Sequence, residues 1–137
     1  MHRPLALLLC ASLWTACAVP GPGAEHVPGT ALDGRWGGAH VELLLLPSGG
    51  SIEYDCADGA LDTAVVLDAD GNFRVPGRHV RGHGGPEQIG EQLPSQPALY
   101  EGSVAGDRMQ LRVRVDADTL GPFTLQRGAD AQLLKCL

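Results

Sequence analysis

The chain has 137 residues, of which 44% are hydrophobic and only 4% aromatic, and its formal net charge is −6. This length suits a single domain with its own core. The ten basic residues are spread along the sequence, a pattern that predicts neither a nucleic-acid-binding surface nor one for an anionic membrane. The 19 glycines and 10 prolines fall mostly between short apolar runs, which is typical of an all-β chain with many turns.

The N-terminus has the features of an export signal. His2 and Arg3 give it a positive start, and residues 5–14 form an apolar run without charges. A run of ten is too short to span a bilayer as a helix, which takes about 20 residues, but it suits the apolar part of a signal peptide. We therefore predict a signal peptide over residues 1–16.

Thr15, Ala16 and Cys17 resemble the lipobox of bacterial lipoproteins, although Trp14 stands where that family usually has leucine. The resemblance implies that the chain is cleaved before Cys17 and that Cys17 is acylated. The protein would then belong to the cell envelope and be attached to the membrane, its expected partner, through the N-terminal lipid. Ala18 matches the pattern for the outer membrane, facing the periplasm, if the host has two membranes. The alternative is an ordinary signal peptide cut after Ala16 or Ala18, which gives a secreted or periplasmic protein.

Residues 17–31 are rich in proline and glycine and show no packing pattern. Such a composition is typical of a flexible linker. We therefore place the folded domain at residues 32–137. Cys10 would be removed with the signal peptide.

Within that domain apolar and polar residues alternate with a period of two, the pattern of half-buried strands. The expected inward-facing residues include Val41, Leu43, Leu45, Ile52, Tyr54, Cys56, Phe73, Val75, Tyr100, Val104, Met109, Leu111, Val113, Val115, Phe123 and Leu125. Turn sequences separate about eight such segments, at 47–50, 68–71, 105–107 and 116–121. Because closure removes exposed sheet edges, we predict a small antiparallel up-and-down β-barrel.

The sequence "LDGRWGG" places Gly34 and Trp36 just before the first strand. This G-x-W pattern resembles the start of lipocalin-like and avidin-like barrels. The resemblance implies that Trp36 packs at the barrel base against an arginine from the last strands, for which Arg127 is the candidate. The short motifs "WGG", "DCADG", "HGGP" and "KCL" also resemble those of a group of small bacterial lipoproteins. That resemblance implies no particular activity.

Cys56 and Cys136 remain in the mature chain. An exported domain reaches a compartment that permits disulfides, so we expect these two cysteines to pair. Chain entropy gives such a long loop about 4–5 kcal/mol of stabilisation, less any strain. The alternatives are two buried free thiols or a metal-binding pair.

Residues 78–97 form the longest irregular stretch and contain His79 and His83. On an extended strand these histidines would be about 13 Å apart, too far to share one ion. A curled loop could bring them together, with His40 or Glu87 as a third ligand. The alternative is a strand ending at residues 79–81 and then a polar loop, 82–97, over the barrel opening.

We find no catalytic or cofactor signature. "DADGN" at 68–72 suits a hairpin turn better than a calcium loop, and Ser103 in "GSVAG" lacks a nucleophile elbow. The sequence therefore favours a non-catalytic binding or accessory module of the cell envelope, with the barrel interior filled by side chains. The alternatives are a carrier of a small apolar ligand and a metal-dependent enzyme that uses His79 and His83.

Overall fold

The structure, a computed structural model, describes residues 27–86, 88–134 and 136. The predicted signal peptide, Cys17 and most of the predicted linker lie outside these residues. The described chain forms eight strands: β1 (Gly34–Gly38), β2 (Val41–Leu46), β3 (Gly49–Tyr54), β4 (Ala57–Leu61), β5 (Asn72–Arg81), β6 (Ser95–Ala105), β7 (Arg108–Val115) and β8 (Asp118–Arg127). Within this part of the chain, no helix is long and apolar enough to span a membrane.

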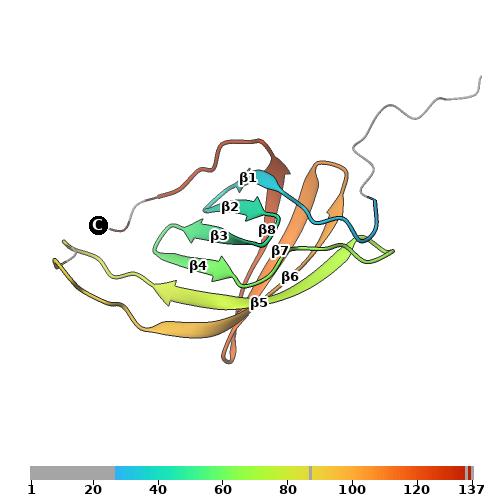
Figure 1. Cartoon of the computed structure of the whole chain (residues 1–137). Helices are drawn as coiled ribbons and strands as arrows, with labels where there is room; N and C mark the ends of the chain where they lie inside the picture. The colour runs from blue at the N-terminus through green and yellow to red at the C-terminus, as the bar shows by residue number, and fades with distance from the viewer. Residues whose placement is uncertain (1–26, 87, 135, 137) are drawn as a thin grey trace, which may run out of the picture.

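The strands form one closed antiparallel barrel in which every strand pairs with its sequence neighbours and β8 pairs back with β1 (Figure 1). This confirms the predicted all-β, up-and-down architecture of about eight strands. Strand β7 follows the predicted alternation along its whole length: each of its inward residues is buried and each outward residue is exposed. Closure between β1 and β8 is short and runs over three residue pairs, from Trp36–Arg127 to Gly38–Leu125.

Side chains fill most of the interior of the barrel. Trp36 and Tyr100 are the largest fully buried side chains, and leucine, valine, isoleucine and methionine occupy most of the remaining space. The ring of Tyr100 fits because Gly59 and Gly77 leave room for it, since a Cβ atom at either glycine would collide with that ring or its hydroxyl. The glycines thus allow a bulky aromatic residue to cross a narrow barrel.

One end of the barrel, which we call the closed end, carries the β2–β3, β4–β5 and β6–β7 connections. Leu32, Val65 and Leu67 are almost fully buried there, and the Leu32 amide donates to the Val65 carbonyl at 2.7 Å. Ala31 pairs with Val66 in an isolated bridge. Contacts between the entering chain and the barrel therefore begin within the last residues of the predicted linker.

Trp36 and Arg127 also pack at the closed end. The guanidinium carbon of Arg127 lies 4.5 Å from the centre of the Trp36 ring, within the range of a cation–π contact. Arg127 donates to the Asp33 carbonyl at 3.0 Å, and its guanidinium lies 3.6 Å from an Asp107 carboxylate oxygen. One charged side chain thereby links β8 to the segment before β1 and to the β6–β7 turn.

Two details differ from the sequence-based expectation. The irregular stretch covers only residues 82–94, because β6 begins at Ser95 rather than after residue 97. Cys56 was expected to face the core, but it is exposed in the bend that follows β3. The inward alternation of β3 stops at Tyr54, so the strand parity no longer applies two residues later.

Candidate functional site

The opposite end, which we call the open end, carries the β1–β2, β3–β4, β5–β6 and β7–β8 connections. Two neighbouring cavities of about 370 Å³ and about 340 Å³ lie there. They share three lining residues, His79, Arg81 and Leu120. The larger cavity also has Tyr54 and Phe123 in its wall. The open end is therefore hollow, whereas the closed end is filled by side chains.

His79 lies between the two cavities on β5. It is only 3% exposed and is the one buried polar or charged residue within the described part of the barrel. Its ring centre lies 5.6 Å from that of Tyr54, and its Nδ1 atom has no hydrogen-bond partner within the described residues. Burial, and next the positive charge of Arg81, lower the pKa of His79. The imidazole is therefore held in its neutral form, with unused hydrogen-bonding capacity.

Tyr54 contributes a second unsatisfied polar group. Its hydroxyl is buried and finds no hydrogen-bond partner within the residues the structure describes. Burial, and next the neighbouring Tyr100 hydroxyl, strongly raise the pKa of Tyr54. Tyr100, deeper in the barrel, donates its hydroxyl to the Arg78 carbonyl at 2.7 Å, and burial raises its pKa to about 12. Both phenols therefore stay neutral, but only Tyr100 is satisfied.

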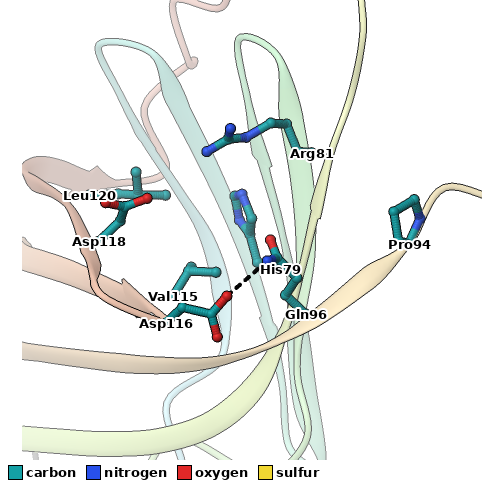
Figure 2. A pocket seen from close by; sticks show the side chains of 8 residues that line it. All are labelled: His79, Arg81, Pro94, Gln96, Val115, Asp116, Asp118 and Leu120. Atoms are coloured by element: carbon teal, nitrogen blue, oxygen red, sulfur yellow. Dashed lines mark hydrogen bonds between the residues drawn. The ribbon is translucent and has the colours of Figure 1, made fainter.

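The rim of the smaller cavity is polar (Figure 2). Gln96 on β6 donates to the carboxylate of Asp116, in the β7–β8 turn, at 2.9 Å. Arg81 extends over His79 in the same view. The site thus combines an apolar floor with charged groups of both signs at its edge, the usual composition of a small-molecule pocket.

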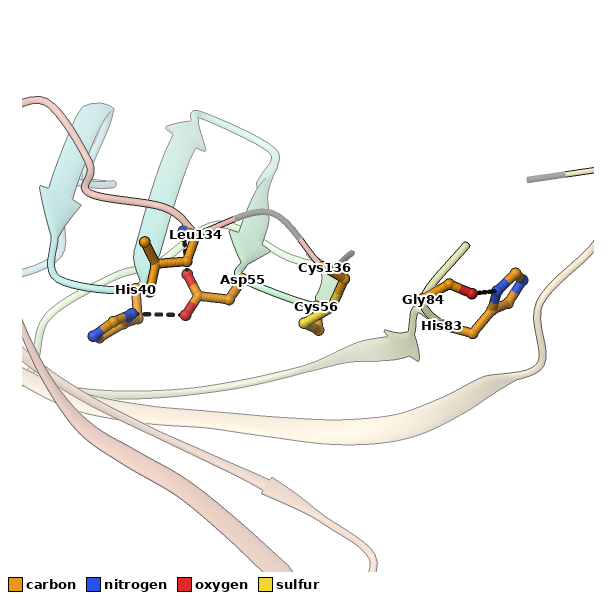
Figure 3. Close-up of a disulfide and its surroundings, with 7 residues drawn as sticks. All are labelled: His40, Asp55, Cys56, His83, Gly84, Leu134 and Cys136. Atoms are coloured by element: carbon orange, nitrogen blue, oxygen red, sulfur yellow. Dashed lines mark hydrogen bonds and ion pairs between the residues drawn. A yellow bond between two sulfur atoms is a disulfide. The ribbon is translucent and has the colours of Figure 1, made fainter. Parts of the chain in front are cut away.

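The C-terminal segment fastens one side of the open end (Figure 3). Cys136 forms a disulfide with Cys56, 80 residues earlier in the chain, as the sequence predicts. The Leu134 amide donates to Asp55 at 2.7 Å, and His40 contacts the other carboxylate oxygen at 2.6 Å. The Leu134 amide, and to a lesser extent His40, lower the pKa of Asp55. We call residues 128–136 the C-terminal strap.

The three histidines proposed as weak metal ligands lie in different surroundings. His79 is inside the barrel, His40 pairs with Asp55, and His83 contacts Glu91 at 2.8 Å in the β5–β6 loop. Among the described residues, no group of three histidine, cysteine or acidic side chains is arranged to hold a metal ion. Glu87, the other suggested ligand, lies outside the described residues.

Sequence reasoning identified Tyr54 as an inward residue but did not connect it with His79, Arg81 and Leu120. The alternation in β5 could have identified His79, because it places this residue on the inward side with Phe73 and Val75. A histidine in an otherwise apolar inward row indicates a special position. On β8 the alternation identified Phe123 but not Leu120, since the pairing of β7 with β8 is irregular between Leu111 and Val113.

No protein-family model, curated protein or solved structure matches this chain. The fold and the open end therefore carry the functional argument by themselves.

Proposed function

We propose that this protein is a lipid-anchored binding module of the cell envelope that holds a small, mostly apolar molecule at the open end of its barrel. The observation that carries the proposal is the pair of adjoining cavities, which share His79, Arg81 and Leu120 as walls. Each cavity lies within the size range of small-molecule pockets. The rest of the interior is occupied by side chains, so the open end is where such a ligand fits.

The lining supports a particular kind of ligand. Leu120, Phe123 and Tyr54 offer apolar surface in the larger cavity. His79 and Tyr54 each hold a buried polar atom without a partner, and burying such an atom unpaired costs about 1–3 kcal/mol. A ligand with one polar group near its centre could satisfy these atoms after a small side-chain rearrangement. Arg81 at the rim would favour a ligand with a negative or strongly polar end.

The anchor part of the proposal depends on the sequence before the described residues. The small residues before Cys17 and the apolar run of residues 5–14 support cleavage and acylation at that cysteine. The Cys56–Cys136 bridge also suits a chain that leaves the reducing cytoplasm. A binding barrel on a tether would sample ligands close to the membrane surface.

Binding at the open end can be tested with N-phenyl-1-naphthylamine, a neutral apolar dye that fluoresces when it leaves water. We expect the wild-type protein to bind it at one site. Leu120→Glu, which places a charge in the wall of both cavities, should weaken binding at least tenfold. Leu46→Glu is the matched control, because Leu46 is 51% exposed at the closed end. Equal binding by all three proteins would contradict the proposed site.

The anchor can be tested separately by intact mass measurement of the protein from its native host. We expect a mass that begins at Cys17, carries acyl chains and lacks two hydrogens because of the disulfide. Cys17→Ser should remove the acyl chains and release the protein from the membrane fraction. A mature chain that is cut after Ala16 or Ala18 and bears no lipid would overturn the anchor, but it would leave the ligand site untouched.

A further inference from the structure

The outer wall of the barrel is divided by charge, although the arginines are scattered along the sequence. Strands β5 and β7 each present arginines on their outward side, which is exposed along both strands. Pairing with β6 places Arg74, Glu101 and Arg112 in one row across three strands. We call this surface the basic wall, and it consists of Arg74, Arg78, Arg108, Arg112 and Arg114 around Glu101.

The basic wall retains a positive surplus after its ion pairs are counted. Arg74 and Arg114 share Glu101, at 3.3 and 3.1 Å. Arg78 lies 3.5 Å from Asp62 at the edge of the wall. Five guanidinium groups against two carboxylates leave a formal surplus of three positive charges. This surplus lies on a chain whose overall charge is −6, so the distribution is strongly uneven.

The opposite wall has the opposite sign. In an eight-stranded barrel β2 and β3 lie across from β6 and β7. Glu42, Glu53 and Asp58 stand in one register row across β2, β3 and β4, on the side of those strands away from the buried residues. Arg35 on the adjoining β1 pairs with Glu42 and Asp130, so one guanidinium stands against these carboxylates and the wall stays negative. Near an anionic surface, the barrel would therefore turn its basic wall toward that surface and its acidic wall away from it.

We propose that the basic wall rests on the anionic phospholipid surface of the membrane that carries the anchor. This inference rests on the lipid anchor of the proposed function. Clusters of four to eight arginines or lysines beside a membrane attract anionic lipids, and each basic residue contributes about a fivefold gain in binding. Modest attraction suffices for a tethered domain, since the tether keeps the effective concentration of the surface high.

The length of the tether permits this orientation. The described chain enters the barrel at the closed end, beside the β4–β5 connection. About 12 residues separate Cys17 from the first barrel contact at Gly29, and they could span up to about 40 Å if fully extended. The longest strand, β6, has 11 residues and is therefore about 36 Å long. The barrel can thus lie on its side against the membrane that anchors it.

The test uses the chain from residue 27 onward, which has no anchor. All of its buried apolar residues lie between Leu32 and Leu125, so this part carries its whole core. We expect it to sediment with vesicles of phosphatidylcholine and phosphatidylglycerol in a 7:3 ratio, and not with pure phosphatidylcholine. Binding should disappear when salt is raised from 20 to 300 mM, because added ions screen surface charges.

The matched variants are Arg112→Gln and Arg35→Gln, which both remove one positive charge. Arg112 lies on the basic wall, whereas Arg35 lies on β1 and pairs with Glu42 of the opposite wall. We expect Arg112→Gln to weaken vesicle binding about fivefold and Arg35→Gln to leave it within twofold of the wild type. Equal losses in both variants, salt-sensitive binding of a second copy without vesicle binding, or no difference between the two lipids would each overturn the proposal. The intact mass at Cys17 tests the anchor independently.

Discussion

The two ends of the barrel are built from the same alternating strands but are closed in different ways. At the closed end, Trp36 has no solvent exposure and contacts Arg127, while Leu32, Val65 and Leu67 fill the opening. At the open end, the C-terminal strap is attached by one disulfide and a few hydrogen bonds. One end is held by packing, and the other is held mainly by a covalent bridge and polar contacts.

This difference indicates where stability and binding are located in a barrel with few aromatic residues. Packing of large side chains leaves no room for a ligand, so the end that contributes most to the core is poorly suited to binding. A disulfide contributes through the entropy of the unfolded chain and leaves the neighbouring space free. The open end can therefore keep its cavities. Buried polar atoms without a hydrogen-bond partner among the described residues occur at both ends, on His79 and Tyr54 at the open end and on Trp36 and Arg127 at the closed end.

The largest expected effect is the loss of stability when packing at the closed end is removed. Trp36→Ala should lower the free energy of unfolding by about 3–5 kcal/mol, because it removes a fully buried aromatic side chain and leaves a cavity. Chemical denaturation at neutral pH measures this change. At the open end, Leu120→Ala should cost about 1 kcal/mol or less, since Leu120 is only partly buried. Similar losses for the two variants would show that the ends do not differ as described.

The next effect concerns the covalent attachment of the open end. Replacing Cys56 and Cys136 by serine should lower the free energy of unfolding by about 2–5 kcal/mol, the upper end being the chain-entropy value for a loop across 80 residues. The strap should also loosen, so the Leu134 and Gln132 amides, which donate to Asp55 and Gly38, should exchange faster with deuterium. Unchanged exchange at both amides would mean that hydrogen bonds hold the strap without the disulfide.

The sequence predicted the closed end better than the open end. The apolar rows could be assigned because alternation depends only on neighbours along one strand. The packing of Trp36 against Arg127 was expected from the resemblance of the G-x-W pattern to lipocalin-like and avidin-like barrels. Cys56 was assigned to the wrong side because the strand stops before it. The open end depends on Tyr54, His79 and Leu120 from three separate strands, and their meeting follows from barrel closure and from an irregular β7–β8 pairing. Neither feature leaves a pattern within a single segment.

A smaller effect is expected when the two buried tyrosine hydroxyls are removed, one with a hydrogen-bond partner and one without. Tyr100→Phe should lower the free energy of unfolding by about 1 kcal/mol, because the Tyr100 hydroxyl donates to the Arg78 carbonyl. Tyr54→Phe should leave it unchanged or raise it slightly, since the Tyr54 hydroxyl has no partner among the described residues. The two variants lose the same atom, so each serves as the control for the other. A clear loss in Tyr54→Phe would mean that its hydroxyl is satisfied in solution.

The smallest expected effect is the pH dependence that His79 gives the open end. Burial, and next the charge of Arg81, lower its pKa in the folded state below the ordinary value of 6.5. Below that pH the unfolded chain binds a proton more readily than the folded chain does, so stability falls as the medium is acidified. We expect the free energy of unfolding to fall between pH 7.5 and pH 5.5 more in the wild type than in His79→Leu. The comparison cancels the contributions of the other titratable groups, which both proteins share. An equal fall in the two proteins would show that His79 can be protonated without cost, and that the open end is wetter than its buried imidazole indicates.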